Sequence, residues 1–300
     1  MKHGLVLEGG GLRSLFSAGI MDVMMDEGIR FDGIIGVSAG ATFGCNYKSH
    51  QPGRALRYNM RFRNDPRYIS LRSWLTTGDL VGARFSYHTM PSELDIFDRE
   101  TFAADASAFY VVCTDVCTGQ PVYHRIDEMD DVEMDWLRAS ASMPVVSRPV
   151  SLGGRLLLDG GISDSIPLRF FQGEGYERCV VILTQPRGFR KRRTRLMPVI
   201  RWAMRRYPAI VEAMNRRHEM YNAQLDYLLS QAARGSILLI QPQQPLNIGR
   251  TELDAGKMQR VYDLGRHTGT EYLPRIIEFL SGKIIPNRSI DCYALNGISL

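Results

Sequence analysis

The sequence predicts an α/β fold with a mainly parallel central sheet. The first evidence is two short apolar runs at residues 4–8 and 33–37, which are typical of buried strands, with helix-patterned sequence between them. The second is another pair of apolar runs, at residues 179–183 and 236–240, again separated by helix-patterned sequence. Strands joined by a helical crossover run parallel in one sheet, so both pairs favour an α/β protein.

The segment between the first two strands has the spacing of a helix that packs on the sheet. Its apolar residues include Leu15 and Val23, and Gly28 is a suitable residue to end the helix. Because parallel strands end at the same edge of a sheet, the residues that follow each strand should meet there. Residues 9–11 and Ser38 are therefore expected to be neighbours in space.

Ser38 is the candidate nucleophile. It lies in Gly36-Val37-Ser38-Ala39-Gly40, which fits the G-x-S-x-G pattern of a serine held on a tight strand-to-helix turn. Small flanking residues permit the strained backbone that such a turn requires. The alternative interpretation is that the two glycines only allow close helix packing.

Gly9, Gly10 and Gly11 form a loop whose amides can bind negative charge. Their N–H groups have no side chains screening them and lie at the start of the following helix. Beside Ser38 they are expected to form an oxyanion hole, with the Ala39 N–H as a further donor. A nucleotide phosphate loop is the competing interpretation, since the run also resembles G-x-G-x-x-G, but the third glycine is absent.

The middle of the chain is expected to contain helices, a strand hairpin and one weakly patterned segment. Helices are predicted at residues 39–47, near 55–60 and at 132–141, and a hairpin from the runs 108–113 and 122–124. Residues 61–106 have short apolar pieces interrupted by proline and glycine. Such a segment often supplies a lid or a pocket wall, and irregular surface packing is the alternative.

An acidic residue at a strand end is the expected partner of Ser38. The apolar run at residues 155–158 ends in Asp159 and two glycines, which leave the backbone free to turn the carboxylate toward the edge that carries Ser38. Asp115, at the end of another strand, and Asp164 are the alternatives.

The last part of the chain is predicted to be largely helical. Helices are expected from Pro167, over the apolar pattern at 210–228, and at 252–264 and 270–281, followed by a tail from Lys283. A Ser-His-Asp triad would need His218 or His267. Because His218 falls on the 210–228 helix and His267 in a polar turn, a catalytic histidine is not expected.

The formal charge of +5 is unevenly distributed. Nine Lys or Arg and no acidic residues lie between Arg187 and Arg206, so the rest of the chain is net −4. Mixed with Trp202 and aliphatic residues, this basic segment suits peripheral binding to an anionic membrane surface, and a solvated charged loop is the alternative. No recognised nucleic-acid-binding motif accompanies it, so nucleic acid is not an expected partner.

Composition narrows the class of protein further. With 44% hydrophobic and 23% charged residues, one globular domain is expected over residues 1–300, with a motif-bearing core at 4–185 and a helical, basic part at 186–300. No run of about 18 apolar residues occurs and the first strand leaves no room for a signal peptide, so a cytoplasmic location is expected. Five scattered cysteines predict reduced thiols, and neither a metal nor a cofactor is expected.

Taken in order, these motifs resemble the patatin-like phospholipase family of bacterial serine acyl hydrolases. The matching residues are Gly9-Gly10-Gly11-x-Arg13, Gly36-x-Ser38-x-Gly40, the segment from Ala139-Ser140 to Pro144, and Asp159-Gly160-Gly161. The resemblance covers residues 4 to about 168. It implies a three-layer α/β/α sandwich and a Ser38–Asp159 dyad that hydrolyses lipid acyl esters. Arg13 is a candidate contact for the anion or a lipid phosphate, or else a surface arginine at a helix start.

In the expected mechanism, Asp159 accepts the Ser38 proton, Ser38 attacks the acyl carbonyl and the glycine loop holds the oxyanion. A solution pKa of about 3.9 makes an aspartate a weak base, so positioning must supply much of the acceleration. Two rival functions would use the same pocket. One is an acyltransferase that passes the acyl group to an alcohol, and the other is a non-catalytic lipid-binding protein.

Overall fold

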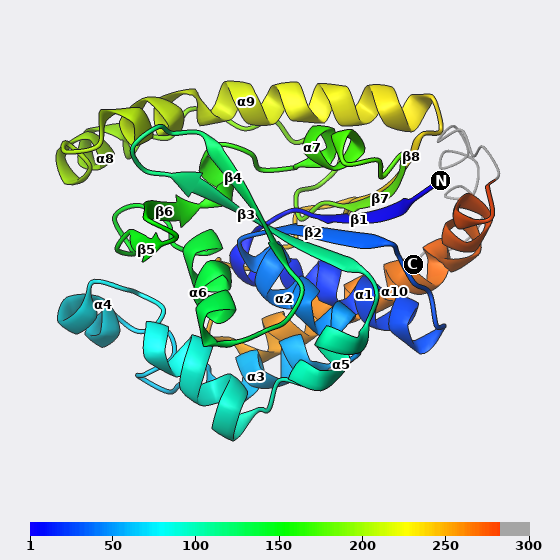
Figure 1. The fold of residues 1–300 in the computed structure, drawn as a ribbon, viewed down its shortest axis with the longest axis horizontal. Coiled ribbons are helices and arrows are strands. Elements are labelled where there is room, and N and C mark those ends of the chain that lie inside the picture. Colours follow the sequence, from blue (N-terminus) through cyan, green and yellow to red (C-terminus); the bar gives the residue numbers. More distant parts are fainter. Residues whose placement is uncertain (283–300) are drawn as a thin grey trace, which may run out of the picture.

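The computed structural model describes residues 1–282, and its centre is a sheet of eight strands (Figure 1). The strands are β1 His3–Leu7, β2 Gly33–Val37, β3 Ala108–Asp115, β4 Pro121–Ile126, β5 Val150–Leu152, β6 Arg155–Asp159, β7 Arg178–Ile182 and β8 Ile237–Ile240. They lie in the order β5-β6-β3-β2-β1-β7-β8, and β4 pairs with β3 outside this path. Strands β1, β2, β3, β7 and β8 are parallel, whereas β4, β5 and β6 run antiparallel to their partners. The predicted, mainly parallel sheet is confirmed.

Helices cover both faces of this sheet. They are α1 Leu15–Asp26, α2 Ala39–Lys48, α3 Arg54–Phe62, α4 Leu71–Thr77, α5 Arg99–Ala104, α6 Asp131–Ser140, α7 Leu168–Gly173, α8 Met197–Ala203, α9 Pro208–Ala233 and α10 Ala255–Leu280, with short helices η1 Gly11–Ser14, η2 Phe85–Leu94 and η3 Gly160–Ile162. Successive strand residues point to opposite faces, so Leu5 and Leu7 pack with α1, α2 and α10, and Val6 packs with α7 and α9. Figure 1 shows α9 on one side of the sheet and α1 and α10 on the other. The fold is the three-layer α/β/α sandwich that the resemblance implies.

Strand β3 brings the ends of β2 and β6 together. It pairs with β4 along one edge, so β2 and β6 share its other edge. Strand β2 occupies that edge up to the pair of Val37 with Val112, and at the next position Asp159 of β6 lies opposite Cys113. Because Ser38 follows Val37 directly, the strand register alone places Ser38 and Asp159 next to each other. Strand β6 runs antiparallel to β3, so its last residue, Asp159, is the one that lies nearest to the end of β2.

One helix replaces the two that the sequence predicts near the C-terminus. The segments 252–264 and 270–281 belong largely to the single helix α10, so the turn expected around His267 is wrong. The glycines that favoured a turn serve close packing instead, since a Cβ at Gly265 would lie 2.1 Å from the carbonyl oxygen of Phe16. Helices α1 and α10 therefore pack backbone against backbone.

The other predicted elements are confirmed, with small shifts of their ends. The weakly patterned segment 61–106 contains α4, the π-helix η2 and α5. These helices are short, and Pro91 lies inside η2, which explains why the sequence pattern is weak there. The tail predicted from Lys283 lies outside the described residues.

The structure of residues 1–282 was expected to contain neither a membrane-spanning helix nor a metal site. Within residues 1–282, no helix combines the length and the apolar character needed to cross a bilayer. Over the same range, no group of three or more His, Cys, Asp or Glu side chains is placed to hold a metal ion.

Candidate active site

Ser38 occupies a strained turn between β2 and α2. Its backbone has φ 55° and ψ −125°, a conformation that residues other than glycine rarely adopt. The flanking glycines are required by close approach of the chain. A Cβ at Gly36 would lie 2.5 Å from the backbone nitrogen of Ala41, and one at Gly40 would lie 2.5 Å from the carbonyl oxygen of Leu7. The chain thus has the tight turn that presents a nucleophile.

Ser140, at the end of α6, anchors this turn. The Ser38 N–H donates to Ser140 Oγ at 2.9 Å, and the same hydroxyl donates to the carbonyl oxygen of Val112 at 2.6 Å. Ser140 is fully buried. One side chain therefore ties the strained backbone of the nucleophile to β3.

The glycine loop lies directly beside Ser38. A Cβ at Gly9 would lie 2.7 Å from the Cβ of Ser38. The Leu12 N–H donates to the carbonyl oxygen of Arg250 at 3.1 Å, whereas no hydrogen bond within residues 1–282 engages the N–H groups of the three glycines. These amides, together with that of Ala39 at the start of α2, are available to a ligand.

A buried carboxylate holds the glycine loop in place. Glu8 accepts hydrogen bonds from the Thr184 N–H and from the Tyr221 hydroxyl, each at 2.7 Å. The Thr184 hydroxyl lies 3.1 Å from both the Glu8 carboxylate and the Gly9 carbonyl oxygen. Strand-end reasoning could have found Thr184, because it follows the predicted strand at 179–183. Tyr221 carries no such signal.

Asp159 is the acidic residue beside Ser38. It is buried, its carboxylate accepts the Gly161 N–H at 2.7 Å, and its own N–H donates to the Ser142 carbonyl at 2.7 Å. Burial raises the pKa of Asp159, and the positive charge of Arg217 and polar contacts with Ser38 and Gly161 oppose this shift. A carboxylate with a raised pKa is a stronger base for a hydroxyl proton than a free aspartate.

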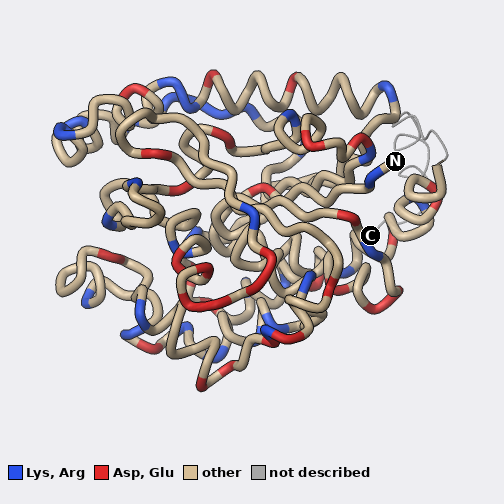
Figure 2. Tube along the Cα trace, in the orientation of Figure 1, with Lys and Arg blue, Asp and Glu red and all other residues tan. Residues whose placement is uncertain are grey.

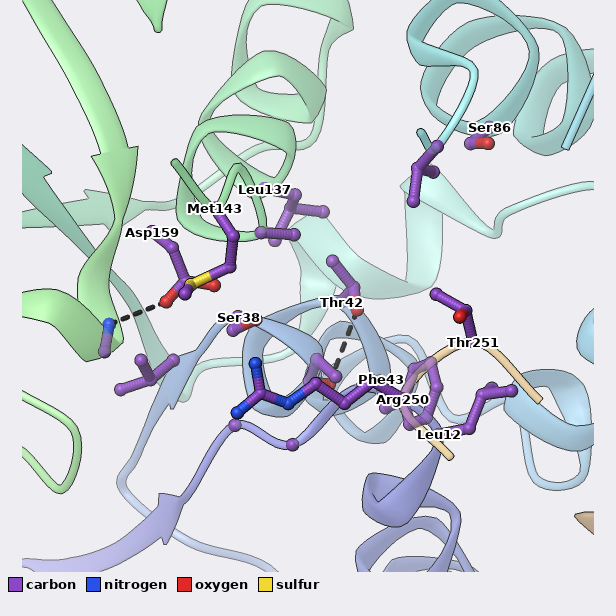
Figure 3. A pocket seen from close by; sticks show the side chains of 18 of the residues that line it. Leu12, Ser38, Thr42, Phe43, Ser86, Leu137, Met143, Asp159, Arg250 and Thr251 are labelled. Carbon is purple, nitrogen blue, oxygen red and sulfur yellow. Dashed lines mark hydrogen bonds between the residues drawn. The ribbon is translucent and has the colours of Figure 1, made fainter. Parts of the chain in front are cut away.

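These groups line one cavity of about 390 Å³ (Figure 3). Every residue that the sequence proposed for the site lies on its wall, namely Gly9, Gly10, Gly11, Arg13, Ser38, Ala39 and Asp159. The alternatives Asp115, Asp164, His218 and His267 do not line it. Within the described part of the chain no histidine lines this cavity, so its geometry offers a Ser-Asp pair rather than a triad.

Much of the cavity wall is apolar. Its lining includes Phe43, Tyr58, Tyr68, Ile69, Leu80, Val81, Met90, Phe97, Met134, Leu137 and Val146. Several of these residues belong to the 61–106 segment, which therefore forms a pocket wall, one of its two expected roles. Its action as a lid stays a prediction. An apolar cavity of this kind can hold an acyl chain.

Five cationic side chains also line the cavity. Arg54 is paired with Asp95, and the other four are Arg13, Lys191, Arg217 and Arg250. Burial and the charge of Arg250 lower the pKa of Arg13, and burial and the neighbouring guanidinium groups lower the pKa of Lys191 to about 7. Figure 3 shows the guanidinium of Arg250 extended toward Ser38. Sequence reasoning assigned only Arg13 to the site. It placed Lys191 in the basic segment expected to contact a membrane, and nothing in the local sequence marks Arg217 or Arg250.

Comparison with known proteins gives matches over most of the chain. Residues 5–171 match the family model described as patatin-like phospholipase, and residues 207–281 match a domain of unknown function. YjjU of Escherichia coli (strain K12), described as an uncharacterized protein, is 27% identical over 286 residues, covering 93% of this chain and 79% of YjjU. Lysophospholipase NTE1 of Kluyveromyces lactis is 25% identical over 294 residues, covering 92% of this chain and 19% of NTE1. The chain thus spans about a fifth of that relative. Among solved structures, VipD from Legionella pneumophila matches with a TM-score of 0.46 and 14% identity, covering 91% of this chain and 67% of VipD.

Proposed function

The chain belongs to the patatin-like phospholipase family, and from this premise we propose that it hydrolyses lipid acyl esters with Ser38 and Asp159 as a catalytic dyad. Family membership by itself makes the chain a lipid carboxylic ester hydrolase. The observation that supports the dyad is that the strained serine turn, a buried carboxylate and a set of free amides line one cavity. Strands β2 and β6 pair with adjacent positions of β3, and this register supports placing the two side chains next to each other.

The proposed reaction begins with proton transfer from the Ser38 hydroxyl to Asp159, while Ser38 Oγ forms a bond to the acyl carbonyl carbon. The tetrahedral intermediate then collapses, the bond to the alcohol oxygen breaks, and Asp159 returns the proton to the departing alcohol. A water molecule, deprotonated by the same carboxylate, then attacks the acyl-enzyme; the bond between the acyl carbon and Ser38 Oγ breaks, Asp159 returns the proton to Ser38, and the fatty acid is released. One ester and one water give one acid and one alcohol.

The glycine loop supplies the oxyanion hole in this proposal. Four backbone N–H groups lie beside the nucleophile, those of Gly9, Gly10, Gly11 and Ala39. Within the described chain, none of them donates a hydrogen bond. Loss of one such donor typically costs about 10² to 10³ in rate. Arg13 places positive charge next to the same loop, which favours the developing anion.

The dyad is tested by fatty acid release from a lysophospholipid, a substrate that the name of the NTE1 relatives favours. We expect Ser38→Ala and Asp159→Asn each to abolish turnover while thermal unfolding shows a folded protein. Asp164→Asn is the matched control, because Asp164 is a buried acid outside the cavity and should leave turnover in place. Full activity in a folded Ser38→Ala variant would refute the assignment.

Two rival functions are separated by the same assay. An acyltransferase would form acylated product only when an alcohol acceptor is added, whereas a hydrolase releases fatty acid without one. A non-catalytic lipid-binding protein would bind the lipid and release nothing.

We further propose that the basic segment Arg187–Arg206 contacts an anionic membrane surface. Trp202 is 71% exposed and Leu196 is 63% exposed, on or next to α8. Figure 2 shows Lys and Arg positions along the chain at the α8 end of the molecule. Basic residues mixed with exposed apolar ones favour peripheral membrane contact, each charge near the surface contributing about 1 kcal/mol. Sedimentation with anionic vesicles at low and high salt tests this, and absence of binding at low salt would count against it. A cytoplasmic location and the lack of a nucleic-acid partner stay predictions.

A further inference from the structure

We infer that the C-terminal part of the chain adds a phosphate subsite to this active site, in which Lys191, Arg217 and Arg250 bind the phosphate on the alcohol side of the ester. The substrate class is then a single-chain acylglycerol phosphate, whose hydrolysis gives a fatty acid and glycerol phosphate. This inference rests on the proposed function, because it assigns a substrate to the same nucleophile.

The cavity carries an excess of positive charge. Arg54, one of the lining cations, is paired with Asp95 at 3.1 Å. The rest of the lining carries four cationic groups against two carboxylates, which leaves between one and two positive charges in excess near pH 7, because a pKa of about 7 makes Lys191 partly neutral there. None of these four cations makes a salt bridge within residues 1–282. The carboxylates are already engaged, because Glu8 accepts hydrogen bonds from a backbone amide and a tyrosine hydroxyl, and Asp159 is the proposed base.

Arg217 and Lys191 are held in place at the proposed subsite. Arg217 Nε donates to the Gly161 carbonyl oxygen, two residues after Asp159, so its guanidinium is fixed at the dyad. Lys191 Nζ lies 4.1 Å from the ring centroid of Tyr221. Both residues line the cavity and their positive charges repel each other, since the charge of Arg217 lowers the pKa of Lys191. A bound anion would relieve this repulsion.

Arg250 is an exposed residue of the cavity lining. Its backbone carbonyl accepts the Leu12 N–H at 3.1 Å, which fixes the segment that carries it against the glycine loop. Its side chain is exposed and extends toward Ser38 in Figure 3. The guanidinium therefore stands beside the nucleophile, where the alcohol part of an ester substrate would lie.

A phosphate monoester fits this arrangement better than the other head groups of lipids. It carries a charge of about −1.5 to −2 near pH 7, which matches the excess, and guanidinium and ammonium groups bind its oxygens with charge-assisted hydrogen bonds. A choline head group would add a cation to a site that already repels cations. A neutral glycerol would leave the excess charge without a partner.

The inference also gives a role to the segment that matches a domain of unknown function. Arg217 and Arg250 both lie within residues 207–281, whereas the proposed dyad lies within the 5–171 match. On this account, the first segment supplies the chemistry and the second selects the head group.

The test compares three soluble substrates with the same short acyl chain: an acylglycerol 3-phosphate, the uncharged monoacylglycerol and the acylglycerol phosphocholine. We expect the wild type to show a kcat/KM for the phosphate monoester at least tenfold above that for either of the others. Arg250→Gln and Lys191→Gln should each reduce this preference about tenfold, which is the effect of losing one charge-assisted contact, and Arg250→Lys should retain part of it. Arg234→Gln is the matched control, because it removes the same charge from an exposed position of the C-terminal part that does not line the cavity.

The outcomes separate this inference from the proposed function. Equal kcat/KM values for the three substrates, or a preference unchanged in both Arg250→Gln and Lys191→Gln, would overturn the subsite while leaving the hydrolase intact. Turnover that survives in Ser38→Ala would instead overturn the proposed function. If inorganic phosphate stabilises the wild type but not Arg250→Gln against heat, and no lipid preference exists, the site binds free phosphate and the head-group assignment is wrong.

Discussion

Replacing Ser140 by alanine tests how the fold holds the nucleophile. The Ser140 hydroxyl accepts the Ser38 N–H at 2.9 Å and donates to the Val112 carbonyl at 2.6 Å in a fully buried position. Ser140→Ala would leave a buried N–H without a partner, which costs about 1–3 kcal/mol. A loss near 2 kcal/mol corresponds to a fall in Tm of about 3 °C for a chain of this length. The strained backbone of Ser38 would also lose its anchor.

The assay for this variant combines calorimetric unfolding with the rate of labelling by a fluorophosphonate probe. We expect labelling to slow at least tenfold, because about 1.4 kcal/mol of lost positioning in the transition state is a factor of ten in rate. Ser142→Ala is the matched control from the same segment. The buried Ser142 hydroxyl donates to the Arg138 carbonyl at 2.8 Å and accepts no backbone N–H, so its loss should cost only about 0.5–1.5 kcal/mol and should leave labelling unchanged. If Ser140→Ala unfolds and labels like Ser142→Ala, the anchoring argument is wrong.

Three further predictions concern the loop, a buried acid and the helix interface. Gly9→Ala would place a methyl 2.7 Å from the Cβ of the nucleophilic serine, so we expect kcat to fall about 10²-fold or more, and an unchanged kcat would exclude these amides as the oxyanion hole. Burial raises the pKa of Asp22 to about 6, so its stabilising protonation is complete below about pH 4 and is lost as pH rises through 6. Asp22→Asn should therefore raise the free energy of unfolding by up to about 3 kcal/mol at pH 8 and leave it unchanged at pH 4, which thermal unfolding at the two pH values would measure. A gain independent of pH would contradict this. Gly265→Ala would press a methyl to 2.1 Å from the Phe16 carbonyl oxygen and should cost about 1–3 kcal/mol in thermal unfolding, whereas Gly173→Ala, with open space around it, should not.

Local patterns were sufficient to predict the sheet and the proposed dyad. Apolar runs at residues 4–8 and 33–37 ended where β1 and β2 end, so the strand-end rule placed the glycine loop beside Ser38. Asp115 also ends a strand, and the two glycines that follow Asp159 are what favoured Asp159, although the sequence could not show that β6 is antiparallel. The pairing of β3 with both β2 and β6 is what makes the placement work.

The parts that sequence reasoning missed depend on contacts between distant segments. Glycine has a low helix propensity, so Gly265 favoured the end of a helix at this point. The close approach of α1 explains why a glycine lies inside α10. Arg217 reaches the cavity from α9 and Arg250 from the segment between β8 and α10, and neither belongs to a local motif. Thr184 could have been noticed at the end of β7, but its bond to Glu8 joins residues 176 positions apart.

The central claim is that Ser38 is an activated nucleophile, and intact-mass spectrometry after treatment with a fluorophosphonate probe tests it most directly. The account predicts a single adduct on the wild type, mapped by peptide analysis to Ser38, and no adduct on a folded Ser38→Ala variant. Equal labelling of the two proteins, or an adduct on a different serine, would contradict it.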